Sequence, residues 1–392
     1  MMDYRETYYF TGKCLSIDRY PERVKGIADT LTSGNVNWEL FVWTASNHLV
    51  LQTIFVKFRK HDLLRLLPED LTRHLEYVHS LNSDRNKNIR RHLLEINSKL
   101  TAEGIVPVFM KGAGNLLDAL YGDEGERLMQ DVDILVSDSE MEKAAGVLLD
   151  NGFSSKEEYD GKYRIALKHY PQLWKEALPA PLELHRLPVS LDYEKIFGYG
   201  MVNSGKRRAK AFRECFVMSD RHKVIHNFIH THLMHLGYLH TRIFLRDMYD
   251  MMLLSERDDP GETLAGFGHY RRKAAGYLRV VSKVLGTPLV THQKMKGKGR
   301  FFSYRHNKLL KAGYLSKVFF LLVRYLQLYI TLPAKALWDR RYRLFVAKRL
   351  GSPQWYGRHI KGYREKFGSN REKFGSNREK FGSNRENFGN NR

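Results

Sequence analysis

Apolar residues recur at helical spacing through the first hundred residues of the chain. Two stretches carry this spacing, Trp38 to Phe58 and Leu71 to Leu100. Pro68-Glu69-Asp70 stands where the second helix would begin, because proline and acidic residues favour the first turn of a helix. Residues 1–103 are therefore predicted to form an N-terminal helical region.

The pattern changes at residue 104, where short apolar runs alternate with polar turns. Runs at 105–110 and 131–136 suit buried strands, and residues 139–151 suit a helix. Further strand candidates lie near 162–169 and 181–187. This mixture predicts an α+β core over residues 104–200, with helical extensions on both sides.

A glycine-bearing turn interrupts the pattern between the first two strands. Lys111-Gly112-Ala113-Gly114-Asn115 follows the first apolar run directly and should break it. An apolar helix of one or two turns is expected next, ending at Gly122 and Gly125. The segment therefore resembles a strand, a turn and a short helix in succession.

Beyond the core, residues 201–363 are predicted to be helical and basic. Val318 to Ile330 is apolar at nearly every position and has basic residues on both sides. It could lie on an anionic membrane surface, but a buried core helix explains so continuous an apolar run more simply. Because Arg324 interrupts the apolar stretch Val318 to Leu332, which is short for a bilayer, no transmembrane segment is expected.

The net charge of +22 is concentrated in the second half of the chain. Residues 1–200 hold 25 Lys and Arg against 30 Asp and Glu, whereas residues 201–363 hold 32 against 9. Residues 263–338 contain 15 Lys or Arg and no acidic residue. Such a region should attract a polyanion, either nucleic acid or an anionic surface, unless it is a solvated face without a specific partner.

The last 29 residues repeat a heptapeptide. Arg-Glu-Lys-Phe-Gly-Ser-Asn begins at residues 364, 371 and 378, and a degenerate copy begins at 385. One apolar residue per heptad cannot form a coiled-coil seam, and glycine and asparagine disfavour helix, so residues 364–392 are predicted to be a disordered tail. The only two cysteines, Cys14 and Cys215, do not suggest a disulfide framework, so we expect a cytoplasmic protein.

Two aspartates one residue apart are the strongest chemical signal. Asp131 and Asp133 stand at the start of the second predicted strand, and alternation along a strand points both side chains the same way. Adjacent carboxylates repel each other unless a cation lies between them, and Mg²⁺ or Mn²⁺ takes oxygen ligands of this kind. The pair therefore predicts a metal site.

Leu100 to Gly152 resembles an uncharacterised bacterial nucleotidyltransferase family of the polymerase-beta-like superfamily. The motifs that carry this resemblance are Gly104-Ile105, Met110-Lys111-Gly112, Tyr121, Arg127, Asp131-Val132-Asp133-Ile134-Leu135-Val136 and Gly152-Phe153. Pro181-Leu182-Glu183-Leu184-His185 is similar to a later strand of the family, and His226 to Leu254, with Arg246-Asp247-Met248, to its helical region. The resemblance covers residues 40–256 and implies a small mixed sheet with flanking helices.

The resemblance also implies roles for individual residues. Asp131, Asp133 and Glu183 would hold the metal, and Glu183 would help to activate an acceptor hydroxyl. Gly112 and Gly114, with neighbouring Asn115, would cradle the nucleotide phosphates, and Lys111 and Arg127 would be phosphate or structural contacts. His185 would orient the acceptor or act as a base, although a structural hydrogen bond to a neighbouring carboxylate fits it equally well.

Two functions follow from these assignments. In the first, the chain is a Mg²⁺-dependent nucleotidyltransferase that moves a nucleoside monophosphate from a nucleoside triphosphate to an acceptor hydroxyl and releases pyrophosphate. In the second, the fold is catalytically inactive, and the basic second half binds nucleic acid or another polyanion. His222, His226 and His230 are four residues apart, but without interleaved acids they indicate a helix that lines the cleft or packs in the core more than a zinc site.

Overall fold

The computed structural model describes residues 1–240, 243–312 and 314–350, so the heptapeptide tail lies outside the described residues. The chain divides into two compact units. Unit 1 comprises Met1–Asp160 and Lys168–Arg324, and unit 2 comprises Gly161–Leu167 and, within the described chain, residues 325–350. The division into four sequence regions stays a prediction.

The N-terminal region of unit 1 is helical, as predicted. Its first four helices are α1 (Tyr4–Leu15), α2 (Val24–Thr32), α3 (Trp38–Asn47) and α4 (Leu51–Lys60). The stretch from Trp38 to Phe58 is thus two helices. They are separated at Leu49, whose φ of 58° lies in the left-handed region that a right-handed helix cannot accommodate.

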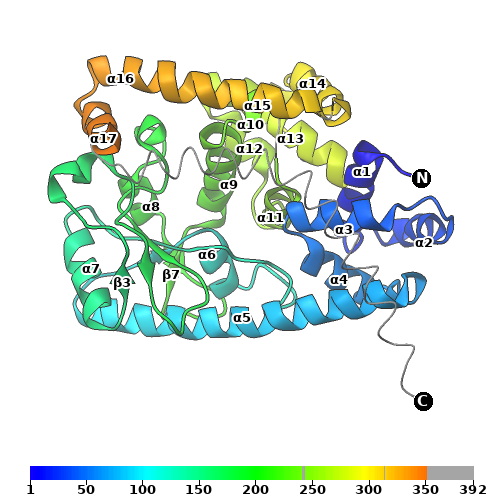
Figure 1. The fold of residues 1–392 in the computed structure, drawn as a ribbon, viewed down its shortest axis with the longest axis horizontal. Helices are drawn as coiled ribbons and strands as arrows, with labels where there is room; N and C mark the ends of the chain where they lie inside the picture. The colour runs from blue at the N-terminus through cyan, green and yellow to red at the C-terminus, as the bar shows by residue number, and fades with distance from the viewer. Residues whose placement is uncertain (241–242, 313, 351–392) are drawn as a thin grey trace, which may run out of the picture. The chain divides into compact units, whose positions relative to one another are not determined.

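A single long helix, α5 (Glu69–Ala102), supports both the sheet and the N-terminal helices. Pro68 is its N-cap residue, Glu69 and Asp70 complement the helix dipole in its first turn, and its 34 residues extend about 50 Å. In Figure 1 it runs beneath α7 (Met141–Asp150), α6 (Lys111–Leu117) and the sheet, and begins beside α4.

Seven strands of the described chain form one mixed sheet in the order β3-β4-β5-β2-β1-β7-β6. Their bounds are β1 Val108–Phe109, β2 Val132–Leu135, β3 Ser154–Ser155, β4 Leu173–Trp174, β5 Leu182–His185, β6 Arg207–Arg208 and β7 Phe216–Val217. At the centre, β2 pairs parallel with β5 and antiparallel with β1. This arrangement, with its flanking helices, confirms the predicted α+β fold class.

Several element predictions were wrong in detail. The first strand begins only after Pro107, which has no N–H to donate to a ladder. The strand predicted at 162–169 is a 3₁₀ segment, Gly161–Ala166, in which local hydrogen bonds replace strand pairing. Residues 205–256 are not continuously helical, because β6 and β7 form a hairpin whose second strand pairs with β1.

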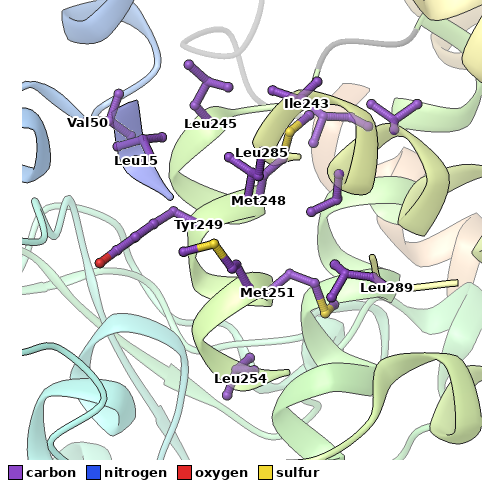
Figure 2. Packing of buried hydrophobic residues seen from close by; sticks show 14 of the residues in the cluster. Leu15, Val50, Ile243, Leu245, Met248, Tyr249, Met251, Leu254, Leu285 and Leu289 are labelled. Atoms are coloured by element: carbon purple, nitrogen blue, oxygen red, sulfur yellow. The ribbon is translucent and has the colours of Figure 1, made fainter. Parts of the chain in front are cut away.

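Two hydrophobic clusters stabilise unit 1. One lies between the sheet and helices α5, α6 and α7. The other joins the N-terminal helices to the later ones, and Figure 2 shows some of its side chains, among them Leu15, Met248 and Leu285. The later helices of unit 1 are α8 Tyr199–Ser204, α9 Asp220–Phe228, α10 Gly237–His240, α11 Leu245–Leu254, α12 Pro260–Ala265, α13 Arg271–Leu285 and α14 Arg300–Lys311.

The C-terminal part of the described chain is helical, as predicted. Helix α15 (Tyr314–Leu326) continues through a π-helical segment, Gln327–Thr331, into α16 (Leu332–Trp338), and α17 (Arg340–Leu350) follows. The boundary between the two units falls at residue 324, within this helical segment. Within unit 2, α17 packs against α16 and against the 3₁₀ segment Gly161–Ala166.

Candidate active site

The pairing of β2 with β5 brings two buried carboxylates side by side. Asp133 and Glu183 are partners in the parallel ladder, and Leu135 and His185 are partners two residues further along. Side chains alternate along a strand, so Asp133, Glu183 and His185 share one face of the sheet. Their ligand atoms all lie within 4.8 Å of one another.

The His185 imidazole connects the two carboxylates. Its Nε2 atom lies 2.9 Å from Oδ1 of Asp133 and 3.2 Å from Oε2 of Glu183. The other carboxylate oxygen of Glu183, Oε1, accepts a hydrogen bond of 2.9 Å from Nε2 of Gln172. Because Asp133 and His185 are each only 1% exposed, their contact is shielded from water.

Lys111 supplies the positive charge nearest to these carboxylates. Its ammonium donates a 2.6 Å hydrogen bond to Oδ1 of Asp133. The backbone of Lys111 has a φ of 45°, a left-handed conformation that costs a non-glycine residue about 1 kcal/mol or more. The residue is thus held in an unfavourable conformation at the first position of α6, with its side chain directed at Asp133.

The charges at the site hold the pKa values of Asp133 and Glu183 below their usual range. Burial raises the pKa of Asp133, but the Lys111 ammonium and the hydrogen bond to His185 outweigh it, so the pKa lies well below its usual range. The pKa of Glu183 is also held low, because its hydrogen bond to His185 and the nearby His169 outweigh burial. Both carboxylates are therefore anionic at neutral pH.

Asp131 precedes β2 and lies outside the group formed by Asp133, Glu183 and His185. Among the described residues its carboxylate has neither a hydrogen bond nor an ion pair, although it is only partly exposed. Burial, followed by the charge of Asp133, raises its pKa, while Lys111 and Arg246 lower it less. An anionic carboxylate without a partner at this point would gain from an added cation.

Two further cations near the site, Lys168 and Arg246, were given no role there by the sequence pattern, although Arg246 belongs to the later helical motif of the resemblance. Burial and the Lys111 ammonium lower the pKa of Lys168, while the three site carboxylates raise it less. Within the described chain, the Lys168 ammonium makes no hydrogen bond or ion pair. Arg246 lies on α11, where it bonds to Asp247 at 3.2 Å and acts electrostatically on Asp131. Neither residue lies in the strand-turn-helix motif that drew attention to the site.

The predicted phosphate turn is the first turn of α6. Gly112 and Gly114 are both buried helical residues. A Cβ atom on Gly114 would lie 2.4 Å from the carbonyl oxygen of Phe109, and one on Gly112 would lie 2.9 Å from Cγ of Met129. Close packing against β1 and the chain before β2 therefore requires these glycines, whatever they do for a ligand.

Asn115 and Arg127 belong to a buried network beneath the site. Nδ2 of Asn115 donates to the Tyr121 hydroxyl at 3.1 Å, and that hydroxyl donates to Asp250 at 3.0 Å. The Arg127 guanidinium donates to both carboxylate oxygens of Asp250, at distances of 2.9 to 3.2 Å. This geometry favours the structural role for Arg127, because its charge is already paired.

Two of the helical histidines, His226 and His230, lie near the charges of the site. Nε2 of His226 lies 2.9 Å from the carbonyl oxygen of Pro188, and the rings of His226 and His230 stack. Burial, followed by the Lys111 ammonium, lowers the pKa of His226 to about 3 and holds the pKa of His230 well below its usual range. Both imidazoles are therefore neutral at physiological pH.

The donor set fits a divalent cation. Asp133 and Glu183 supply anionic oxygens, Asp131 supplies a third carboxylate, and Oδ2 of Asp133 has no hydrogen-bond partner among the described residues. Mg²⁺ prefers such oxygen ligands, and Mn²⁺ also accepts an imidazole nitrogen. Nδ1 of His185 is buried and, within the described residues, has no hydrogen-bond partner. The carboxylates that could hold an ion thus face Lys111 and lie near Lys168.

A family model described as "Uncharacterised nucleotidyltransferase" matches residues 34–266, which is more than half of the chain. The match includes α5, the whole sheet and α11, and so spans every residue of the candidate site. It confirms the resemblance inferred from the motifs. No curated protein and no solved structure matches the chain.

Proposed function

Because the chain belongs to the uncharacterised nucleotidyltransferase family, we propose that it transfers a nucleoside monophosphate from a nucleoside triphosphate to an acceptor hydroxyl, with Mg²⁺ or Mn²⁺ as cofactor. The family match supports nucleotidyl transfer in general. Metal dependence is supported by the strand pairing that places Asp133 opposite Glu183, close to Asp131, whose carboxylate has no partner among the described residues.

In this proposal Asp131, Asp133 and Glu183 hold the divalent cation. When bound, the cation supplies positive charge to the triphosphate and polarises its phosphoryl oxygens. The low pKa values of Asp133 and Glu183 keep both groups anionic across the physiological pH range, as metal ligands must be.

Lys111 and Lys168 provide the charge that the triphosphate needs apart from the metal. Their ammonium groups interact electrostatically with each other and with the same carboxylates. Two like charges held together in a partly buried site repel each other, and an anionic phosphate between them would relieve that repulsion. We assign Lys168 to the triphosphate because, within the described chain, its ammonium has no partner of its own.

His185 is proposed as a positioning residue. Its Nε2 atom already contacts both Asp133 and Glu183, so this nitrogen is not available as the base for an acceptor hydroxyl. Its contribution is to hold the two carboxylates together in the orientation that a metal requires.

The reaction would proceed by attack of the acceptor oxygen on the α-phosphorus. A new phosphorus–oxygen bond forms to the acceptor, the bond from the α-phosphorus to the bridging oxygen breaks, and pyrophosphate leaves with the bonding electrons. The hydroxyl proton is lost to solvent or to a neighbouring carboxylate. The basic surface of residues 263–338 is proposed to contact an anionic partner separately from this chemistry.

A label-transfer experiment tests this proposal. The protein is incubated with Mg²⁺, a cell extract as source of acceptor, and nucleoside triphosphates labelled at the α- or the γ-phosphate. The α label should enter a product and the γ label should leave with pyrophosphate. Asp133→Asn should abolish transfer, and Asp84→Asn, which changes an exposed carboxylate on α5, should not. Entry of the γ label would contradict nucleotidyl transfer, and absence of transfer would favour the inactive fold.

A further inference from the structure

One helical segment at the end of the described chain is exposed in spite of its apolar sequence. Val318–Trp338 forms 21 helical residues, and only 6% of its apolar window is buried. The expectation of a buried core helix was therefore wrong. The expectation that the segment is too short for a bilayer was also wrong, because the helix continues past Leu332 to Trp338. By length and composition alone, it is the one candidate membrane span in the described chain.

The exposed apolar residues follow one face of the helix. They are Val318, Leu322, Tyr325, Leu326, Tyr329, Ile330, Leu337 and Trp338. Val318, Leu322, Leu326 and Ile330 follow one another at intervals of four residues, and Leu337 comes seven residues after Ile330, which is the spacing of a single helix face. The stripe extends about 30 Å, far more than the scattered apolar residues of an ordinary protein surface.

Aromatic and basic residues accompany this stripe. Trp338 is 88% exposed at its end, and Tyr325 and Tyr329 lie along it. The only charged residues within the segment are Arg324 and Lys335, and no acidic residue occurs between residues 263 and 338. Tryptophan and tyrosine favour the boundary between lipid and water, and basic side chains favour anionic headgroups.

We infer that Val318–Trp338 lies on an anionic membrane surface with its apolar stripe in the headgroup region. The charge of the segment complements such a surface. Arg324 argues against insertion across the bilayer, because it lies well inside the segment and would enter the hydrocarbon. A second copy of the chain would bring two stripes of the same positive charge together, and nucleic acid would leave the apolar side chains in water.

This surface is independent of the proposed chemistry. None of the site carboxylates belongs to the segment, and the family match ends at residue 266. Membrane attachment would confine the enzyme to acceptors at or near a lipid surface. The inference therefore stands or fails on lipid binding alone, whether or not nucleotide transfer is observed.

A vesicle flotation experiment tests the inference. The whole chain is mixed with vesicles of phosphatidylcholine alone or of phosphatidylcholine with phosphatidylglycerol. We expect binding to the anionic vesicles and little to the neutral ones, and we expect added salt to weaken it. Leu322→Asp and Ile330→Asp should each lower partitioning by about tenfold, because each exchanges an apolar contact with lipid for a charge of the same sign as the surface.

Leu81→Asp is the matched control, because Leu81 on α5 and Leu322 have the same exposed fraction, 53%. This variant should float as the wild type does. Absence of flotation by the wild type, or an equal loss with Leu81→Asp, would overturn the inference. Equal binding to neutral vesicles that salt does not weaken would indicate insertion instead. A wild-type dimer that Leu322→Asp dissociates, without lipid binding, would assign the face to a second copy.

Discussion

A buried carboxylate that joins distant parts of unit 1 should contribute strongly to its stability. Asp118, directly after α6, is 0% exposed. Its two oxygens accept hydrogen bonds from Arg207 at 2.7 and 2.6 Å, from Lys223 at 2.5 Å and from Arg257 at 2.8 Å. The backbone N–H of Lys210 adds a fifth bond of 2.9 Å. One anion thus binds three cationic side chains from three different segments.

The cost of Asp118→Asn can be estimated from these contacts. Removing one member of a buried ion pair costs about 3–5 kcal/mol, because the remaining charge has no partner. Asparagine keeps the shape of the side chain, and Asp220 still lies 2.7 Å from Arg207, so the lower end applies. We expect a loss of about 3 kcal/mol, or roughly 4 °C in melting temperature.

Urea unfolding of Asp118→Asn and of a control measures this loss. Asp84→Asn is the control, because the Asp84 carboxylate is exposed and, among the described residues, pairs only with Lys87 on the same helix. It should change the free energy of unfolding by less than about 0.5 kcal/mol, as substitutions at surface positions usually do. If the free energy of unfolding of Asp118→Asn lies within about 1 kcal/mol of the wild-type value, the reasoning about unpaired buried cations is refuted.

The same carboxyl group gives a pH dependence of known sign. Burial raises the pKa of Asp118, but Arg207 and Lys223 outweigh it and hold the pKa below its usual range. A depressed pKa in the folded state adds stability above the unfolded value of about 3.9, and this stability is lost as the pH falls below it. The difference between wild type and Asp118→Asn should therefore shrink below about pH 4.

Three further predictions concern single residues. Gly114→Ala should destabilise the fold by about 1–3 kcal/mol, because the added Cβ would lie 2.4 Å from a carbonyl oxygen of β1. Gly146→Ala on α7 is the control: its Cβ would meet nothing within 4 Å, and it should stabilise the fold by about 0.5–1 kcal/mol. Equal effects of the two variants in thermal melts would contradict this prediction. Lys168→Met should weaken triphosphate binding by about tenfold in calorimetry, and an unchanged dissociation constant would remove Lys168 from the site. Burial lowers the pKa of His306 to about 3, so the free energy of unfolding should fall by about 1.4 kcal/mol per pH unit from this group as the pH falls below about 6.5. In urea unfolding, His306→Leu should reduce the slope of unfolding free energy against pH by that amount. An unaltered slope would argue against a neutral imidazole.

The sequence predicted the elements that carry a long or regular pattern. Helix α5 has an apolar period and a marked start, β2 is apolar except for Asp133, and β5 alternates leucine with polar residues, so all three were found close to their observed bounds. The register that joins Asp133 to Glu183 was not predictable, because parallel pairing depends on contacts between distant segments. That the carboxylates would share one face of the sheet was predicted only from the family resemblance and from the alternation of side chains along each strand.

The remaining features depend on long-range contacts that local patterns do not contain. Strands β6 and β7 have two residues each and are specified by pairing, not by composition. Lys168 lies in an irregular segment and reaches the site through the chain that follows the 3₁₀ turn. The exposure of the helix Val318–Trp338 was also not predictable, because the apolar pattern of a helix is the same whether its apolar face packs on protein or is exposed.

The central claim is that Asp131, Asp133 and Glu183 form a metal-dependent nucleotide site. Thermal shift of the wild type and of Asp133→Asn, with each of the four nucleoside triphosphates and with or without Mg²⁺, tests it most directly and needs no acceptor. A nucleotide at a hundred times its dissociation constant should stabilise the wild type by about 2.7 kcal/mol, only with Mg²⁺, and should leave Asp133→Asn unchanged. A wild type that no nucleotide stabilises, or a variant stabilised equally, would contradict the claim.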